Sequence, residues 1–71
     1  MNKLEYISAY RAFCRNGEKI RISRFTLRKS NEYGLNGYIF RQDSNPVEML
    51  LTSDRKSAFR RFMDIVDFNL S

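Results

Sequence analysis

The segment from Thr52 to Phe68, TSDRKSAFRRFMDIVDF, constrains the fold most, because its apolar residues recur with the period of an amphipathic α-helix. Thr52, Ser53 or Asp54 could cap the first free backbone N–H groups. At about 100° per residue, the apolar side chains fall in one arc of roughly 160°: Ala58, Phe59, Phe62, Met63, Ile65, Val66 and Leu70. The pattern predicts a last helix with one face in the core.

A second helical pattern lies near the N-terminus. Asn2 followed by Glu5 is a variant of the capping box, and Gly17 is a typical stop signal after a basic last turn. We therefore predict a helix over residues 3–15. Asn16-Gly17 is also a strong hairpin turn signal, which leaves a pair of strands as the alternative. The apolar residues favour the helix because they share about half of a helical wheel: Leu4, Tyr6, Ile7, Tyr10, Phe13 and Cys14.

The segment Lys19–Lys29, KIRISRFTLRK, is rich in β-forming residues, but the parity of its apolar positions changes halfway. A β-bulge at Ser23-Arg24 would restore one inner face within a single strand, made of Ile20, Ile22, Phe25 and Leu27. The outer face of this strand would then carry four cations: Lys19, Arg21, Arg24 and Arg28.

The middle of the chain predicts two further strands. Residues 30–36 read as a polar loop containing Gly34, and residues 37–41 as the second strand. A turn at residues 43–46 leads to a third strand at 47–51, whose inward residues would be Val47, Met49 and Leu51. The predicted fold is α+β in the order α-β-β-β-α, a three-stranded antiparallel meander with two helices packed on one face.

Length and charge set the broad class. The 71 residues form a single small domain, residues 1–71, and a chain of this size buries only about 60% of its unfolded surface, which leaves a homodimer open. Thirteen Lys and Arg against eight Asp and Glu give a net charge of +5, so the domain attracts polyanions. The only cysteine, Cys14, fits a reducing compartment, and we expect the cytoplasm.

Residue types that carry chemistry are scarce. The chain has no histidine and one cysteine, so the usual zinc ligand sets and a histidine general base are missing. It has no Gly-rich phosphate loop and no apolar run of about 18 residues. We therefore expect no enzyme activity, no cofactor, no metal site and no membrane partner.

Basic residues on the last helix are the main functional candidates. Arg55 and Lys56 stand at its first turn, where free N–H groups favour an anion, and Arg60 and Arg61 continue along its open side. Together with the outer-face cations of residues 19–29, they predict a non-enzymatic domain that binds the phosphate backbone of DNA or RNA.

The face occupied by two aromatic residues decides how such a domain would bind. Tyr38 and Phe40 beside the strand cations would suit single-stranded nucleic acid, through base stacking and phosphate contacts. If both residues face the core instead, Ile39 lies outside. Alternation alone leaves both arrangements open.

Two families are similar in part. The order α-β-β-β-α resembles the double-stranded RNA-binding domain, and Ser53, Arg55, Lys56 and Ala58 stand where its phosphate-facing helix begins. The run NGYIFR at residues 36–41, followed by a strand, Thr52 and a basic helix, is similar to the arm-binding domains of phage integrases. Both resemblances imply nucleic-acid binding, and neither identifies the chain as a member.

A protein partner is the alternative function. Phe68 falls outside the apolar arc of the last helix, and Tyr33 lies in the loop at residues 30–36. Exposed aromatics are typical anchors of protein interfaces. The chain could therefore be a small regulator or inhibitor that docks on a larger acidic protein.

Overall fold

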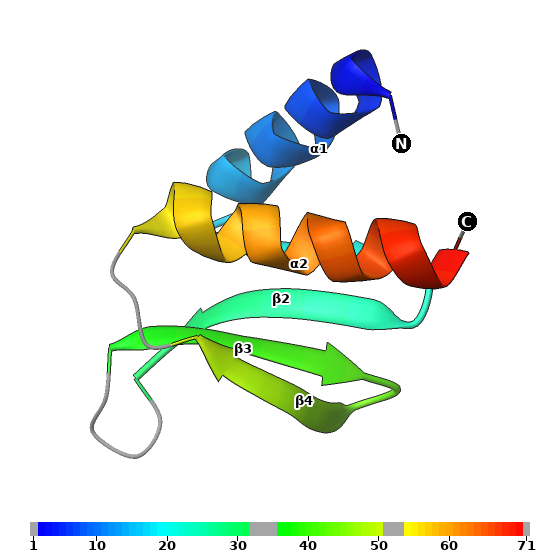
Figure 1. Ribbon diagram of the computed structural model, residues 1–71. Helices are drawn as coiled ribbons and strands as arrows, with labels where there is room; N and C mark the ends of the chain where they lie inside the picture. Colours follow the sequence, from blue (N-terminus) through cyan, green and yellow to red (C-terminus); the bar gives the residue numbers. More distant parts are fainter. Residues whose placement is uncertain (1, 32–35, 51–53, 71) are drawn as a thin grey trace.

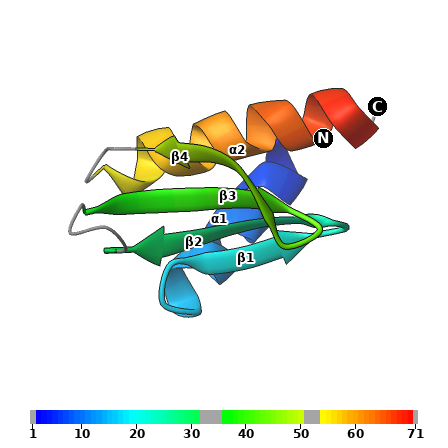
Figure 2. The ribbon, with the colours of Figure 1, turned by 90° about the horizontal axis from the view of Figure 1, so that it is seen from below.

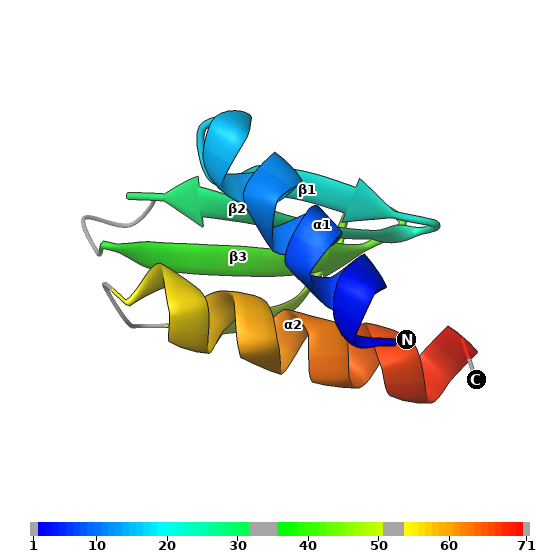
Figure 3. The ribbon, with the colours of Figure 1, turned by 90° about the horizontal axis from the view of Figure 1, so that it is seen from above.

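The computed structural model describes residues 2–31, 36–50 and 54–70 (Figure 1). Its elements are α1 Lys3–Arg15, β1 Lys19–Ile22, β2 Phe25–Ser30, β3 Gly37–Gln42, β4 Asn45–Leu50 and α2 Arg55–Leu70. The strands form one antiparallel sheet in the order β1-β2-β3-β4. Both helices lie on the same face of the sheet, where α1 crosses it obliquely and α2 runs along β3 (Figure 3). The strands stand in front of both helices when the sheet is seen from below (Figure 2), so the other face is open.

The predicted three-stranded meander is wrong, although the class α+β agrees with the structure. Residues 19–30 form two strands joined by a tight turn at Ser23-Arg24, and Ser23 has a φ of 57°. Ile22 lies opposite Phe25 across this turn. Because opposite residues of a hairpin share a face, the turn explains the parity change that we had assigned to a β-bulge. The element order is therefore α-β-β-β-β-α, which differs from the order of the double-stranded RNA-binding domain.

The inward residues predicted for the last strand are also wrong. A turn at Asp43-Ser44, with φ values of 52° and 71°, starts β4 at Asn45. The register shifts between Phe40 and Arg41, which leaves Val47 as an extra, bulged residue. The shift exposes 50% of Val47 and 37% of Met49, because Glu48 and Leu50 take the inward positions: Glu48 opposite Phe40, and Leu50 opposite Tyr38. Leu51, with Gly34 and Tyr33, lies outside the described residues.

The first helix is confirmed with its predicted bounds. The side chain of Asn2 accepts a hydrogen bond from the Glu5 N–H at 2.8 Å, and this contact caps the helix. The chain leaves α1 through Gly17, which has a φ of 72°, and the Glu18 N–H donates to the Phe13 carbonyl at 2.8 Å. This is the hydrogen bond of a Schellman motif, so the glycine signal belongs to a helix end and the strand alternative is excluded.

Asp54 caps the second helix. One carboxylate oxygen accepts from the Lys56 N–H at 3.1 Å and the other from the Ser57 hydroxyl at 2.7 Å. These hydrogen bonds hold the pKa of Asp54 below its usual range, with the Ser57 hydroxyl as the larger cause. Thr52 and Ser53 lie outside the described residues. Most of the predicted apolar arc is buried; Ile65 is partly buried, and Leu70 is 52% exposed because α2 extends beyond the sheet.

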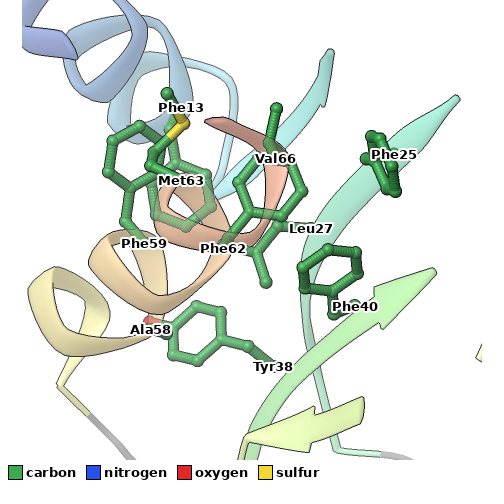
Figure 4. Packing of buried hydrophobic residues seen from close by; sticks show 10 residues of the cluster. All are labelled: Phe13, Phe25, Leu27, Tyr38, Phe40, Ala58, Phe59, Phe62, Met63 and Val66. Atoms are coloured by element: carbon green, nitrogen blue, oxygen red, sulfur yellow. The ribbon is translucent and has the colours of Figure 1, made fainter. Parts of the chain in front are cut away.

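An aromatic core joins the helices to the inner face of the sheet (Figure 4). The rings of Phe13 and Phe59 lie 5.2 Å apart, and those of Phe40 and Phe62 lie 5.0 Å apart. The buried cluster comprises Phe13, Phe25, Leu27, Tyr38, Phe40, Ala58, Phe59, Phe62, Met63 and Val66. Tyr38 and Phe40 therefore face the helices, and Ile39 faces the other side of the sheet.

A polar contact closes the end of this core. The Tyr38 hydroxyl donates to a Glu18 carboxylate oxygen at 2.5 Å, and the Lys29 ammonium lies 3.4 Å from the other oxygen. Glu18 has a φ of 60°, and this backbone turn directs the chain from α1 into β1. The contact thus ties the end of α1 to β2 and β3.

Among the described residues, no helix is both long and apolar enough to cross a membrane.

Candidate functional site

The open face of the sheet is the side that neither helix covers (Figure 2), and several of its outward positions hold cations. Lys19 lies directly opposite Arg28, and both point outward because their neighbours Ile20 and Leu27 point into the core. The next outward residues in this row, Ile39 and Met49, belong to β3 and β4. Ile39 is only 4% exposed, and the long side chains of Arg28 and Met49 stand on either side of it.

A second row of outward residues runs parallel to the first. Arg21 lies opposite Thr26, and Thr26 lies opposite Arg41 on the next strand. Sequence reasoning missed Arg41. Its position follows from that of Tyr38 and Phe40, because alternation places residues 39 and 41 on the face opposite to residues 38 and 40. We call Lys19, Arg21, Arg28 and Arg41 the open-face cations.

The described strands present charge of one sign on this face. None of the outward positions of the described strands carries a carboxylate. Glu18, just before β1, and Glu48, within β4, bind partners on the helix side: Glu18 accepts from Tyr38, and Glu48 pairs with Arg61 of α2 at 3.1 Å. Like charges directly opposite each other, as at Lys19 and Arg28, destabilise a sheet.

Arg24 does not belong to the outward face as predicted, because it lies in the turn between β1 and β2. Its carbonyl accepts from the Asp43 N–H at 2.9 Å, which brings the two hairpin turns together at one end of the sheet.

A shallow hollow of about 700 Å³ opens at the edge where β1 meets α1, and its lining residues are Ala12, Asn16, Lys19, Ile20, Arg21 and Thr26. Two of the open-face cations thus stand at the rim of a concave surface.

The predicted cations of α2 are separated from the open-face cations by the sheet itself (Figures 2 and 3). Arg61 is engaged with Glu48 through two hydrogen bonds of 3.1 and 3.2 Å. Arg55 lies beside Tyr10, and Lys56 and Arg60 line a groove between the two helices. The structure therefore does not bring the two predicted basic sets together into one site.

Aromatic side chains are missing from the outward positions of the described strands. Tyr38 is 1% and Phe40 0% exposed on the other side of the sheet, so of the two arrangements left open by alternation the core-facing one holds, and stacking of these rings on bases is excluded. The described strands therefore offer an anion charge and hydrogen-bond donors on the open face, without aromatic rings on which bases could stack.

Comparisons with known proteins give no family for the chain. It matches no family model, no curated protein and no solved structure at a significant level. The function must therefore be argued from the geometry alone.

Proposed function

We propose that the protein binds the phosphate backbone of nucleic acid through the open-face cations. The observation that carries the proposal is the composition of this face. Four cations occupy outward positions of the described strands, and no outward position of these strands carries a carboxylate. A surface of this kind attracts a polyanion before any specific contact forms.

Spacing favours joint action of these cations. Lys19 and Arg21 are two residues apart in β1, which is about 6.6 Å along a strand, and adjacent strands lie about 4.8 Å apart. These separations are below the Debye length of about 8 Å at physiological ionic strength. The open-face cations therefore act on a phosphate backbone as one patch of charge.

Binding of this type depends strongly on salt concentration and little on the base sequence of the nucleic acid. Phosphate contacts position a protein on nucleic acid, while sequence is read by contacts with base edges. On the open face, the described strands place cations for the first role and no aromatic residue for stacking on unpaired bases. We therefore expect duplexes, which carry the higher charge density, to bind more tightly than single strands of equal length.

The double variant Lys19→Gln/Arg28→Gln tests the proposal. Each phosphate contact adds about 0.9 to the slope of log affinity against log salt concentration, so we expect the slope to fall by about 2 for this variant. Fluorescence anisotropy with a labelled duplex, measured from about 0.05 to 0.2 M salt, gives the slope.

Arg11→Gln/Arg15→Gln is the matched control, because it removes the same charge from exposed residues of α1. We expect this control to keep nearly all of the parent slope. Equal losses in the two double variants would mean that only net charge matters, and the open face would then not be the binding surface.

A protein partner is the second candidate, and the observation that favours it is an apolar end of the molecule. Leu4 in the first turn of α1 is 79% exposed, and Phe68 and Leu70 in the last turns of α2 are 82% and 52% exposed. These helix ends lie on the same side, beside both chain termini (Figures 1 and 3). Apolar association survives salt concentrations that abolish phosphate binding. Sedimentation of the protein at low and high salt therefore separates association through the apolar end from binding through the open-face cations.

The compartment we propose is the cytoplasm. Cys14 is a free, partly buried cysteine, and small secreted domains commonly depend on disulfides for their stability. Cell fractionation of the tagged protein would test this assignment.

A further inference from the structure

A groove between the helices is a second candidate site on the other side of the molecule. It encloses about 330 Å³ and is lined by Tyr6 and Tyr10 of α1 and by Lys56 and Arg60 of α2. Both helices lie on the face of the sheet opposite to the open-face cations (Figures 2 and 3). A ligand in this groove would therefore leave the proposed phosphate-binding face free.

Packing fixes the aromatic wall of the groove. The ring of Phe59 lies 5.3 Å from the ring of Tyr6 and 5.2 Å from that of Tyr10, in inclined arrangements of 71° and 60°. Phe59 itself is fully buried. Rings held in this way lose little further freedom on binding, so they can supply a preorganised surface for a flat ligand.

Two cations form the facing wall. Lys56 and Arg60 are four residues apart in α2, so they project from the same side of the helix. Neither side chain forms an ion pair with another residue in the described parts of the chain, whereas Arg61 next to them is engaged with Glu48. Both remain available to an anion at the edge of the groove.

The hydroxyl of Tyr10 adds an unmet hydrogen bond. This oxygen is buried, and it has no hydrogen-bond partner among the residues that the structure describes. Burial raises the pKa of Tyr10, the neighbouring Cys14 thiol adds to that shift, and the guanidinium of Arg55 opposes it, but neither neighbour forms a hydrogen bond of good geometry with the hydroxyl. A buried polar atom without a partner destabilises the fold, and an ordered water or a ligand atom would relieve that cost.

We propose that this groove binds a single unpaired nucleotide, with its base against the rings of Tyr6 and Tyr10 and its phosphate at Lys56 and Arg60. Base stacking on aromatic side chains and phosphate contacts with cations are the two interactions that unpaired nucleotides use. The volume falls at the lower end of the range of about 300–1,000 Å³ that small-ligand sites occupy. The site goes beyond the function proposed above and does not depend on it.

Titration of the full chain with adenosine 5′-monophosphate, followed by two-dimensional NMR, tests the site. We expect roughly millimolar binding or tighter, with shifts at the four lining residues. Adenosine, which lacks the phosphate, and ribose 5-phosphate, which lacks the base, should each bind about tenfold more weakly. A duplex with one unpaired, 5′-phosphorylated nucleotide, compared with its blunt form, distinguishes the end of a strand from a free nucleotide as the source of the ligand.

Lys56→Gln/Arg60→Gln should weaken nucleotide binding about tenfold, and both replaced residues are exposed, so the fold should persist. Arg11→Gln/Arg15→Gln again removes equal charge elsewhere and should bind normally. The proposal is overturned if both variants bind alike, if the nucleotide causes no shifts at the groove, or if an acidic peptide with one tyrosine binds there more tightly. Lys19→Gln/Arg28→Gln should keep nucleotide binding, so failure of the open-face proposal would be seen separately.

Discussion

The Phe59→Ala variant is expected to lose about 3–5 kcal/mol of folding free energy, the usual cost of removing a buried phenyl ring. Phe59 is 0% exposed, and its ring meets four others: Tyr6 and Tyr10 at 5.3 and 5.2 Å, and Phe13 and Phe62 at 5.2 and 6.4 Å. A domain of this length has a total stability of only roughly 4–10 kcal/mol. The loss would therefore leave a large fraction of the chains unfolded near physiological temperature.

Urea denaturation monitored by circular dichroism measures this effect. Phe68→Ala is the matched control, because it removes the same ring from a side chain in the same helix that is 82% exposed. We expect the control to change stability by about 0.5 kcal/mol or less. Similar losses for the two variants would contradict the assignment of Phe59 to the centre of the core.

The Tyr38→Phe variant is expected to lose roughly 1.5–3 kcal/mol, because it removes a hydrogen bond to a charged group. The Tyr38 hydroxyl donates to the Glu18 carboxylate at 2.5 Å, and the side chain of Glu18 is only 19% exposed. Lys29 keeps its contact with the other carboxylate oxygen at 3.4 Å, which limits the damage. A double-mutant cycle with Glu18→Gln isolates the energy of the Tyr38–Glu18 pair.

The loss of folding free energy in the Tyr38→Phe variant should depend on pH. The hydrogen bond from Tyr38 lowers the pKa of Glu18 from its ordinary value of 4.5, and burial works in the opposite direction. A carboxyl group with a depressed pKa stabilises the fold above its unfolded pKa and loses that contribution as the pH falls through its folded pKa. The difference between parent and Tyr38→Phe should be full at neutral pH and shrink below about pH 4.5. Urea melts at neutral and acidic pH would show it, and a constant difference would rule out the charged hydrogen bond.

Local signals predicted the helices well because each helix carries its own start signal, and α1 also carries a stop signal. Asn2 and Gly17 bound α1, and Asp54 opens α2. Capping groups satisfy backbone groups within a few residues, so their effect can be read without knowing the tertiary fold. The end of α2 was predicted less well, because the burial of Leu70 depends on how far the sheet extends beneath the helix.

The strands were harder to predict, because two local backbone geometries explain the same pattern of apolar residues. A β-bulge and a two-residue turn at Ser23-Arg24 both place Ile22 and Phe25 on the same face. The turn carries a positive φ at a serine, without the glycine or asparagine that usually marks a hairpin. In β4, the partner of Glu48 is Arg61 of α2, a contact between segments that meet only in the folded chain.

The candidate surfaces were predicted only in part, because they also depend on segments that meet only in the folded chain. Alternation was enough to put Lys19, Arg21 and Arg28 on the outer face. Arg41 depended on the face taken by its neighbours in β3, which alternation left open. The groove was missed altogether: Tyr6 and Tyr10 fit a core-facing helix pattern, and only the packing of α1 beside α2 brings them next to Lys56 and Arg60.

The central claim is that the open face of the sheet is the surface that binds nucleic acid. NMR titration of the isotope-labelled protein with a short blunt duplex tests it most directly, because it reports on every strand and both helices in one experiment. We predict shifts concentrated at the open-face cations and at their neighbours Thr26 and Ile39, with α1 little changed. Shifts confined to the helices, or no shifts at low salt, would contradict the account.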